Sequence, residues 1–371
     1  MGWKGSRGSW GFEVKRLDAY ILKGLLKIFL TAELVGFGLL FVIEFFEKLE
    51  TFTRSLQALA FGLLSVLYKS PYFINLFLPL CFLLSILVLF MVMARRNEII
   101  ALRSSGVSTF SLLRPVFLFS FLLAVVSLLA EEFFIPFSLR HADYVYRVKV
   151  KGEQPYVFIK DDEIWVRKGN IVANIELFDG KNDRMAGLTL IEIGRDFSLL
   201  RRIDAKEAIW ETTGWRLLNA VERRFRDGNV EKRVFEETSG LAGTPPSVFK
   251  IVRKGPEEMG IRELRRYIGR LKEGGHDTGR YLVDLYNKVS FPFINLVMVL
   301  IGTALGLRYK KTTHISLGIF LGLSAGFVYW VLHSFSLALG YAEIFPALFS
   351  SFFSSLLLSL LGTIGILTLR R

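Results

Sequence analysis

Apolar residues are gathered into six long runs, which short polar stretches and one long polar segment separate. The runs cover roughly 20–46, 70–94, 111–136, 282–307, 314–339 and 344–369. A bilayer core about 30 Å thick is crossed by about 20 helical residues, and every run is long enough. Barrel strands would alternate apolar and polar positions, and these runs do not. The pattern predicts six transmembrane helices, three before the polar segment and three after it.

The polar segment, about 137–280, has the alternation of β-strands. In "YVFIKDDEIWVRKGNIVANIELFD" apolar and polar residues alternate around turn signals at Asp161-Asp162 and Gly169-Asn170. Two further hairpins are expected, one turning near Gly214 and one at Asp227-Gly228-Asn229. Short strands at this spacing are typical of a sandwich or barrel-like β domain, and "GTPPS" at 243–247 reads as its exit.

A helix is expected after the strands. "IRELRRYIGRLKEGG" places Ile261, Leu264, Ile268 and Leu271 on one face and ends in glycines. The predicted organisation is therefore an α-helical membrane protein with an inserted all-β domain. Its parts are residues 1–136 with three spans, 137–255 with the β domain, 256–280 with an amphipathic helix and linker, and 281–371 with three spans.

Basic residues define the orientation. One set of short flanks carries Lys4, Arg7, Lys15, Arg16, Lys23, Lys27, Arg95, Arg96, Arg103, Arg114, Arg308, Lys310, Lys311, Arg370 and Arg371. The opposite short flanks carry only Lys48, Arg54 and Lys69. Cytoplasmic flanks are the ones enriched in Lys and Arg, so both termini are expected in the cytoplasm and the β domain outside it. The net charge of +13 gathers at membrane edges rather than in one patch, which disfavours nucleic-acid binding.

The chemistry of the chain is sparse. It has no P-loop motif, and His141, His276, His314 and His333 lack metal-ligand spacing. Adjacent carboxylates at Glu131 and Glu132 have no partner base, so they favour an anchor or cap over an enzyme site. We therefore expect no catalytic residue, no metal and no cofactor bound by this chain.

A charged segment, "RRNEIIALRSSGVSTF" at 95–110, connects two spans on the predicted cytoplasmic side. "NEIIALRSSG" reads as a short helix with Ile99 and Leu102 on one face, Glu98 and Arg103 beside it, and Gly106 as its stop. One interpretation is an interfacial turn under the headgroups. The other is a docking helix for a soluble partner, with Arg96, Glu98, Ile99, Leu102, Arg103, Ser105 and Gly106 as the candidate contact residues.

Small and acidic residues mark two of the spans. Small residues allow helices to approach closely in membranes; here they are Gly36 and Gly38 in the first span and Gly318, Gly322 and Gly326 in the fifth. They predict either ordinary helix packing or a movable seam between the two spans. Glu33, Glu44 and Glu47 are intramembrane or near-interface carboxylates, which are expected to face protein or water rather than lipid.

Several stretches resemble the lipopolysaccharide-export permease family LptF/LptG. They are "RLDAYILKGLLKIFL…FEKLE", "NEIIALRSSGVSTFSLLRP", "EEFFIPFS", "WRLLNA", "GHDTGRYLVDLYNKVSFPFINLVMVLIGTALGL" and "GFVYWVLHSFSLALG". They follow the family's order over nearly the whole chain, and "GRYLVDLYNK" and "FEKLE" are closer to its LptG branch. The acidic residue and Ser-Gly pair of the family's coupling helix fall on Glu98 and Ser105-Gly106.

The resemblance implies a permease subunit of an ABC transporter in the bacterial inner membrane, with a jellyroll-like periplasmic β domain. The implied partners are a paralogous LptF/LptG permease, an LptB-type ATPase dimer that uses ATP and Mg, and periplasmic bridge proteins of the LptC and LptA types. Lipopolysaccharide would enter between the first span of one subunit and the fifth span of the other. The five glycines above are then candidate gate residues.

The lipid phosphates need cationic partners. Family members of the LptG branch often place Lys near the outer end of the first span, whereas this chain has Glu44 and Glu50 there, with Lys48 as the one cation expected nearby. Arg140 and Arg147 follow the third span at a similar height, and Arg holds phosphate through paired hydrogen bonds. The candidate substrate residues are Glu44, Glu47, Lys48, Arg140 and Arg147; the alternative is that the arginines anchor the span.

Two other functions remain open from the sequence. The chain could be a permease for another envelope lipid or lipoprotein, or a scaffold that transports nothing. Extracting a lipid with several acyl chains exposes many CH₂ groups at about 0.8 kcal/mol each. A passive site could not recover that energy, which favours a transporter driven by an ATPase.

The orientation gives a testable prediction. Because Asn229 lies in the predicted β domain, a cysteine placed there should react with a membrane-impermeant thiol reagent in intact spheroplasts. Labelling that requires cell lysis would overturn the predicted topology.

Overall fold

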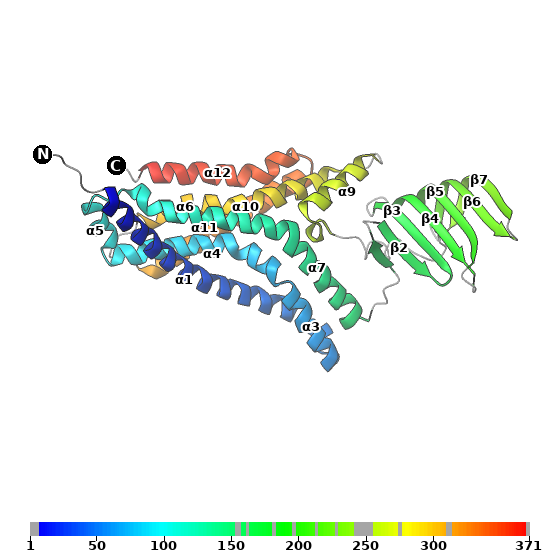
Figure 1. Cartoon of the computed structure of the whole chain (residues 1–371), viewed down its shortest axis with the longest axis horizontal. Helices are drawn as coiled ribbons and strands as arrows, with labels where there is room; N and C mark the ends of the chain where they lie inside the picture. Colours follow the sequence, from blue (N-terminus) through cyan, green and yellow to red (C-terminus); the bar gives the residue numbers. More distant parts are fainter. Residues whose placement is uncertain are drawn as a thin grey trace. The chain divides into compact units, whose positions relative to one another are not determined.

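The computed structural model describes residues 7–152, 157–160, 163–179, 183–194, 198–211, 214–226, 229–240, 255–273, 277–308 and 314–368. These residues form two compact units (Figure 1). The membrane unit combines the described residues up to 151 with 256–265 and those from 279 onward. The β unit takes the described residues of 152–255 and of 266–278.

Six helices of the membrane unit are long and apolar enough to cross a bilayer, which confirms the six predicted spans. They are α1 (Arg7–Glu47), α4 (Ser70–Arg95), α6 (Thr109–Leu129), α10 (Gly279–Gly306), α11 (Ile315–Tyr341) and α12 (Ala347–Leu367). The β domain is inserted between α6 and α10, as the sequence predicts.

Helix α4 lies at the centre of the membrane unit. Its residues Phe82, Ile86 and Phe90 are completely buried in a core that also includes Ile294 and Val299 of α10. By contrast, α1 and α11 are the least buried of the six spans. They leave large apolar surfaces for lipid or another chain.

The third span continues beyond its predicted end at 136. Helix α6 runs without a break into a π-helical turn, η1 (Ala130–Phe134), then α7 (Ile135–Tyr144) and a second π turn, η2 (Val145–Val150). The apolar run stops near 136, but Leu139 and Ala142 of α7 are buried and keep the chain helical. Turns of this kind add one residue to a helix and often occur at functional sites.

The connection between the first two spans contains helices that the sequence pattern did not reveal. They are α2 (Leu49–Phe52) and α3 (Leu56–Tyr68). Ser55 caps α3 by accepting a hydrogen bond from the Ala58 N–H at 3.0 Å. Phe52 is completely buried and lies so close to Gly62 that a Cβ there would overlap its ring. With 13 residues, α3 is too short to be recognised as a span.

The β unit contains one seven-stranded antiparallel sheet in the order β1-β2-β3-β4-β5-β6-β7, so each strand pairs with its sequence neighbours. The predicted all-β insertion is therefore confirmed. The strands are β1 (Val157–Lys160), β2 (Glu163–Lys168), β3 (Ile171–Asp179), β4 (Arg184–Ile193), β5 (Leu199–Glu211), β6 (Gly214–Arg226) and β7 (Asn229–Gly240).

One face of the sheet forms an apolar core. Ile175, Leu188, Ala208 and Leu217 are buried there, and Trp215 packs edge-on against Phe178 with ring centroids 6.2 Å apart. These residues alternate with polar ones, as expected for a sheet with one buried face.

The predicted turns agree with the strand register where the structure describes it. Gly169 has φ 62° between β2 and β3. Pairing of Trp210 with Trp215 and of Arg226 with Asn229 closes the two expected hairpins. The predicted turn at Asp161-Asp162 and the exit at 243–247 lie outside the described residues.

The amphipathic helix predicted after the strands is also present. It is α9 (Ile261–Glu273), preceded by a short 3₁₀ turn, η3 (Pro256–Glu258). Leu264, Ile268 and Leu271 are buried, as their spacing predicts.

An aspartate in β5 gives a pH-dependent prediction. Burial alone would raise the pKa of Asp204, but hydrogen bonds from Arg202 and Thr189, and then from Arg223, lower it. Its stabilising contribution is thus present above its ordinary pKa of 3.8 and is lost as pH falls through the lowered value. At pH 7, Asp204→Asn should lower the free energy of unfolding of the sheet by about 1 kcal/mol, and this difference should shrink on acidification.

Denaturant unfolding of the full chain, followed by tryptophan fluorescence, measures this difference. Glu231→Gln is the matched control, because Glu231 pairs with Arg233 at 3.8 Å and both side chains are more than half exposed. Equal effects of the two substitutions at pH 7 would contradict the prediction.

Candidate functional site

A large apolar groove lies along one side of the membrane unit. Its volume is about 980 Å³. Helix α1 contributes Thr31, Val35 and Leu39 to its lining, and α11 contributes Ile319 and Leu323. The floor is α4, on which both helices pack. Grooves of this size accept large apolar ligands.

Four of the five glycines predicted as gate residues pack on the groove's floor. Side chains of α4 fill the space where a Cβ would stand: Met91 at Gly318, Leu84 and Leu87 at Gly322, Leu80 at Gly326, and Phe77 and Cys81 at Gly36. The fifth, Gly38, faces open space. Within one chain the four packed glycines therefore act in ordinary helix packing, and α1 and α11 stand on either side of a groove. A gate formed with a second subunit stays a prediction.

The charged segment at 95–110 forms a short helix, α5 (Glu98–Ser104), as predicted. The helix ends in a Schellman motif. Gly106 has φ 82° and donates to the Arg103 carbonyl at 3.0 Å, while Val107 donates to the Leu102 carbonyl at 3.0 Å.

The apolar face of α5 does not point outward. Ile99 is buried in the membrane unit's core, and Leu102 packs against that core. Ile99 is therefore not available as a partner contact, because it holds the helix to its own bundle. Leu102 is only partly buried, and its contact with a partner stays a prediction. The exposed side carries Ile100, which is 67% exposed, together with Arg96, Arg103 and Ser105.

Glu98 connects α5 to the first span. Its carboxylate accepts a hydrogen bond from the Tyr20 hydroxyl at 2.9 Å and lies 3.8 Å from the Arg96 guanidinium. Tyr20 and Arg96 also line the groove. A displacement of α5 would thus act directly on one end of the groove.

The C-terminal end of α1 carries a compact charge cluster. Glu44 Oε1 accepts hydrogen bonds from Lys48 Nζ at 2.5 Å and Lys69 Nζ at 2.6 Å. Lys48 also lies over the Tyr146 ring, 4.5 Å from its centroid, and Lys151 lies over the same ring at 5.0 Å. The expectation that Lys48 is the one nearby cation is therefore wrong. The predicted candidate Glu47 is exposed.

The two candidate arginines have acidic partners inside the chain. Arg147 Nε lies 2.7 Å from Asp143, and Arg140 lies 3.9 Å from Glu263. Burial, and then the nearby Asp143 carboxylate, raise the pKa of Glu258 to about 7. A lipid phosphate would compete with these carboxylates, so phosphate contact by Arg140 and Arg147 stays a prediction.

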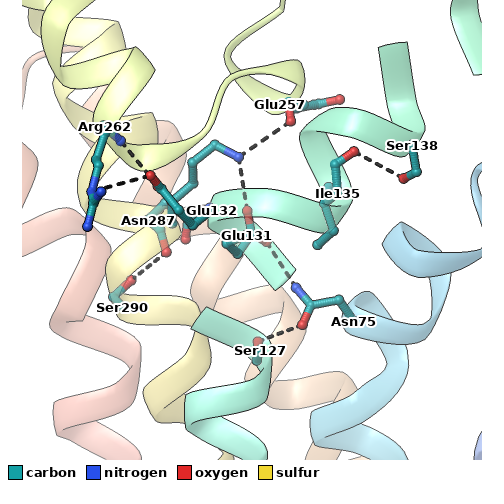
Figure 2. A network of polar contacts seen from close by, with 11 residues as sticks. Asn75, Ser127, Glu131, Glu132, Ile135, Ser138, Glu257, Arg262, Asn287 and Ser290 are labelled. Atoms are coloured by element: carbon teal, nitrogen blue, oxygen red, sulfur yellow. Dashed lines mark hydrogen bonds and ion pairs between the residues drawn. The ribbon is translucent and has the colours of Figure 1, made fainter. Parts of the chain in front are cut away.

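A buried polar network joins five elements of the membrane unit, namely α4, α6, η1, η3 and α10 (Figure 2). Glu131 of η1 lies 2.9 Å from Lys288 Nζ of α10, and both side chains are about nine-tenths buried. The other Glu131 oxygen accepts from Asn75 Nδ2 of α4 at 2.9 Å. Ser127 donates to Asn75 Oδ1 at 2.6 Å, and Lys288 reaches the Glu257 carbonyl at 3.5 Å.

The neighbouring Glu132 holds the start of α9. Its carboxylate accepts from the Arg262 N–H at 3.2 Å, and the Arg262 side chain lies 3.6 Å away. A Cβ at Gly260 would meet the Glu132 carbonyl oxygen at 2.6 Å, so this approach requires glycine. Glu131 and Glu132 thus make the contacts of an anchor and a cap, the roles that the sequence favoured.

Lys288 and Asn75 are functional candidates that the sequence interpretation missed. Lys288 is a cation inside a span, which by itself indicates a buried partner. No spacing rule connects it to Glu131, because the β domain separates the two residues in the sequence.

Comparison with known proteins agrees with this architecture. Residues 19–371 match the family described as "Lipopolysaccharide export system permease LptF/LptG". A lipopolysaccharide export system permease protein LptG of Escherichia coli (strain K12) is 23% identical over 327 residues, which cover 85% of this chain and 88% of that protein. The protein of the same name from Haemophilus influenzae is 23% identical over 358 residues, or 93% of this chain and 96% of that protein.

The buried pair makes a quantitative prediction. Lys288→Met leaves the Glu131 carboxylate without its cation in a buried site, which should lower the free energy of unfolding by about 3–5 kcal/mol. The double variant Lys288→Met, Glu131→Gln should lower the free energy of unfolding by clearly less than the sum of the two single substitutions. Thermal unfolding in detergent measures both, with Lys48→Met as a control in a more exposed pair. Additive effects would show that the pair is not coupled.

Proposed function

The chain belongs to the lipopolysaccharide export system permease LptF/LptG family, and from this membership we propose that it is the transmembrane subunit of an ABC transporter that extracts lipopolysaccharide from the inner membrane. The match over residues 19–371 carries the proposal, because it includes the six spans, the groove and the β domain together. The subunit passes its cargo to a periplasmic bridge of the LptC and LptA types.

The groove supports a role in lipid extraction. Its α1 and α11 walls are the least buried spans of the chain, so a second permease subunit or lipid covers them in the membrane. In the proposed heterodimer, α1 of each subunit stands opposite α11 of the other, and cargo enters between them. The acyl chains of the cargo then move from the bilayer onto an apolar protein surface and not into water. This limits the free energy that extraction requires.

Energy must come from a partner, which we propose is an LptB-type ATPase dimer that binds ATP and Mg on the cytoplasmic side. Its docking surface on this chain is the exposed side of α5, with Ile100 and Arg103 at the centre. The contact from Glu98 to Tyr20 at 2.9 Å then transmits motion of α5 to the groove. This arrangement requires both termini in the cytoplasm and the β unit in the periplasm, as the distribution of basic residues predicts.

The ATPase partnership can be tested on the exposed side of α5. Arg103→Glu and Ile100→Asp should leave membrane insertion intact, because both side chains are exposed. Each should weaken co-purification of the ATPase by tenfold or more. Arg103→Glu loses a desolvated charged contact, which costs about 2–5 kcal/mol, and Ile100→Asp places an unpaired charge in the interface. Leu56→Asp in α3 is the control, because Leu56 is an apolar position even more exposed than Ile100 and lies on the opposite side of the membrane.

The same preparations test the cargo. Lipopolysaccharide should stimulate ATP hydrolysis by the complex that contains the unaltered chain more than other envelope lipids do, and Glu98→Ala should reduce this stimulation more than it reduces assembly. Unchanged assembly in both α5 variants would refute the docking surface. Equal stimulation by lipoprotein or phospholipid would favour a different cargo.

A further inference from the structure

The groove has a cationic end close to the coupling helix α5. Lys23 and Lys27 of α1 line it there, and so does Arg96, which follows α4. The two lysines are four residues apart and therefore share one face of α1. The same face continues with Thr31, Val35 and Leu39 along the apolar part of the groove.

Lys27 lies well inside the span. Gly24 meets the side chain of Leu89, and Leu89 is six residues, or about 9 Å of helix, before α4 ends at Arg95. Gly36 meets Phe77 and Cys81, so α1 and α4 run antiparallel and Lys27 lies still deeper than Gly24. A lysine at such depth normally faces a cavity or pairs with an anion.

The described part of the chain supplies no such anion to the lysines. Arg96 lies 3.8 Å from Glu98, but among the residues that the structure describes neither Lys23 nor Lys27 has an acidic partner. Both side chains are exposed toward the groove's opening. The groove is thus apolar over most of its length and positively charged at one end.

We propose that this end of the groove binds an anionic phospholipid, with its phosphate between Lys23 and Lys27 and its acyl chains along α1, α4 and α11. This goes beyond the proposed function, since the lipid resides at the cationic end of the groove, whereas the exported cargo enters from the other leaflet. Only the assignment to the cytoplasmic leaflet rests on the proposed topology.

The geometry favours a phospholipid of this leaflet over the cargo or a second protein chain. Along α1, Lys27 and the outer charge cluster at Glu44 are about 25 Å apart, so phosphates of the outer leaflet cannot reach the lysines. A packed helix from another subunit would cover the apolar wall but would bring no anion to the lysines unless it carried a carboxylate at their depth. An anionic phospholipid satisfies both parts of the surface.

The proposal can be tested with the full chain in nanodiscs that contain phosphatidylglycerol or phosphatidylcholine with a photoreactive acyl chain. Phosphatidylglycerol should label peptides that contain residues 20–39 in preference to phosphatidylcholine. Lys23→Gln and Lys27→Gln should each lower that labelling by about fivefold, the contribution expected of a basic residue at an anionic headgroup. Lys23→Arg with Lys27→Arg should retain it.

Arg114→Gln is the matched control, because Arg114 is an exposed cation near the start of α6 but does not line the groove. It should leave labelling of residues 20–39 unchanged. Equal labelling by the two lipids, or an equal loss in the Arg114 variant, would overturn the proposal. Efficient disulfide formation between Thr31→Cys copies that excludes lipid labelling would assign the groove to a protein neighbour instead.

Failure of the proposed function would look different. If the proposed function is wrong, the ATPase would not co-purify with the chain, or lipopolysaccharide would not stimulate ATP hydrolysis. The labelling by phosphatidylglycerol that depends on the lysines would still be observed. Labelling of Asn229→Cys only after lysis would reverse the leaflet assignment without removing the preference for the anionic lipid.

Discussion

Close packing of small residues against α4 is the interaction on which the membrane unit depends. Lipid tails are as apolar as the helices, so helices associate in a bilayer by close van der Waals contact rather than by leaving water. Gly318, Gly322 and Gly326 let α11 approach α4 on one side, and Gly36 lets α1 approach on another. Because both helices pack on α4, a groove remains between them, and the proposed transport surface is a by-product of this packing.

Polar contacts then hold the part of the membrane unit around η1 in place. Glu131 connects η1 to α4 through Asn75 and to α10 through Lys288, which secures the helices on both sides of the β insertion. A buried pair of this kind contributes specificity of arrangement more than stability. The cluster around Glu44 is more exposed than this pair, so it is expected to contribute less to fixing the fold.

The sequence was most informative where one physical signal dominates. Long apolar runs predicted all six spans, and alternation with turn residues predicted the sheet, because bilayer thickness and the strand period leave few alternatives. The short helix α3 and the continuation of α6 through α7 were missed, since tertiary contacts such as those of Phe52 and Leu139 stabilise them. The site was harder to predict. Helical spacing put Ile99 and Leu102 on one face, but it could not tell that this face contacts the bundle core.

The π turn η1 has a consequence for how the chain tolerates changes in length. One additional residue in a helical turn rotates everything that follows by about 100° relative to an unbroken α-helix. The side of α7 that bears Arg140 and Asp143 owes its direction to that rotation. A single-residue deletion between Ala130 and Phe134 would turn these side chains away from Glu263 and Glu258 while leaving composition and hydropathy almost unaltered. In this stretch the number of residues therefore constrains the protein as strongly as their identity.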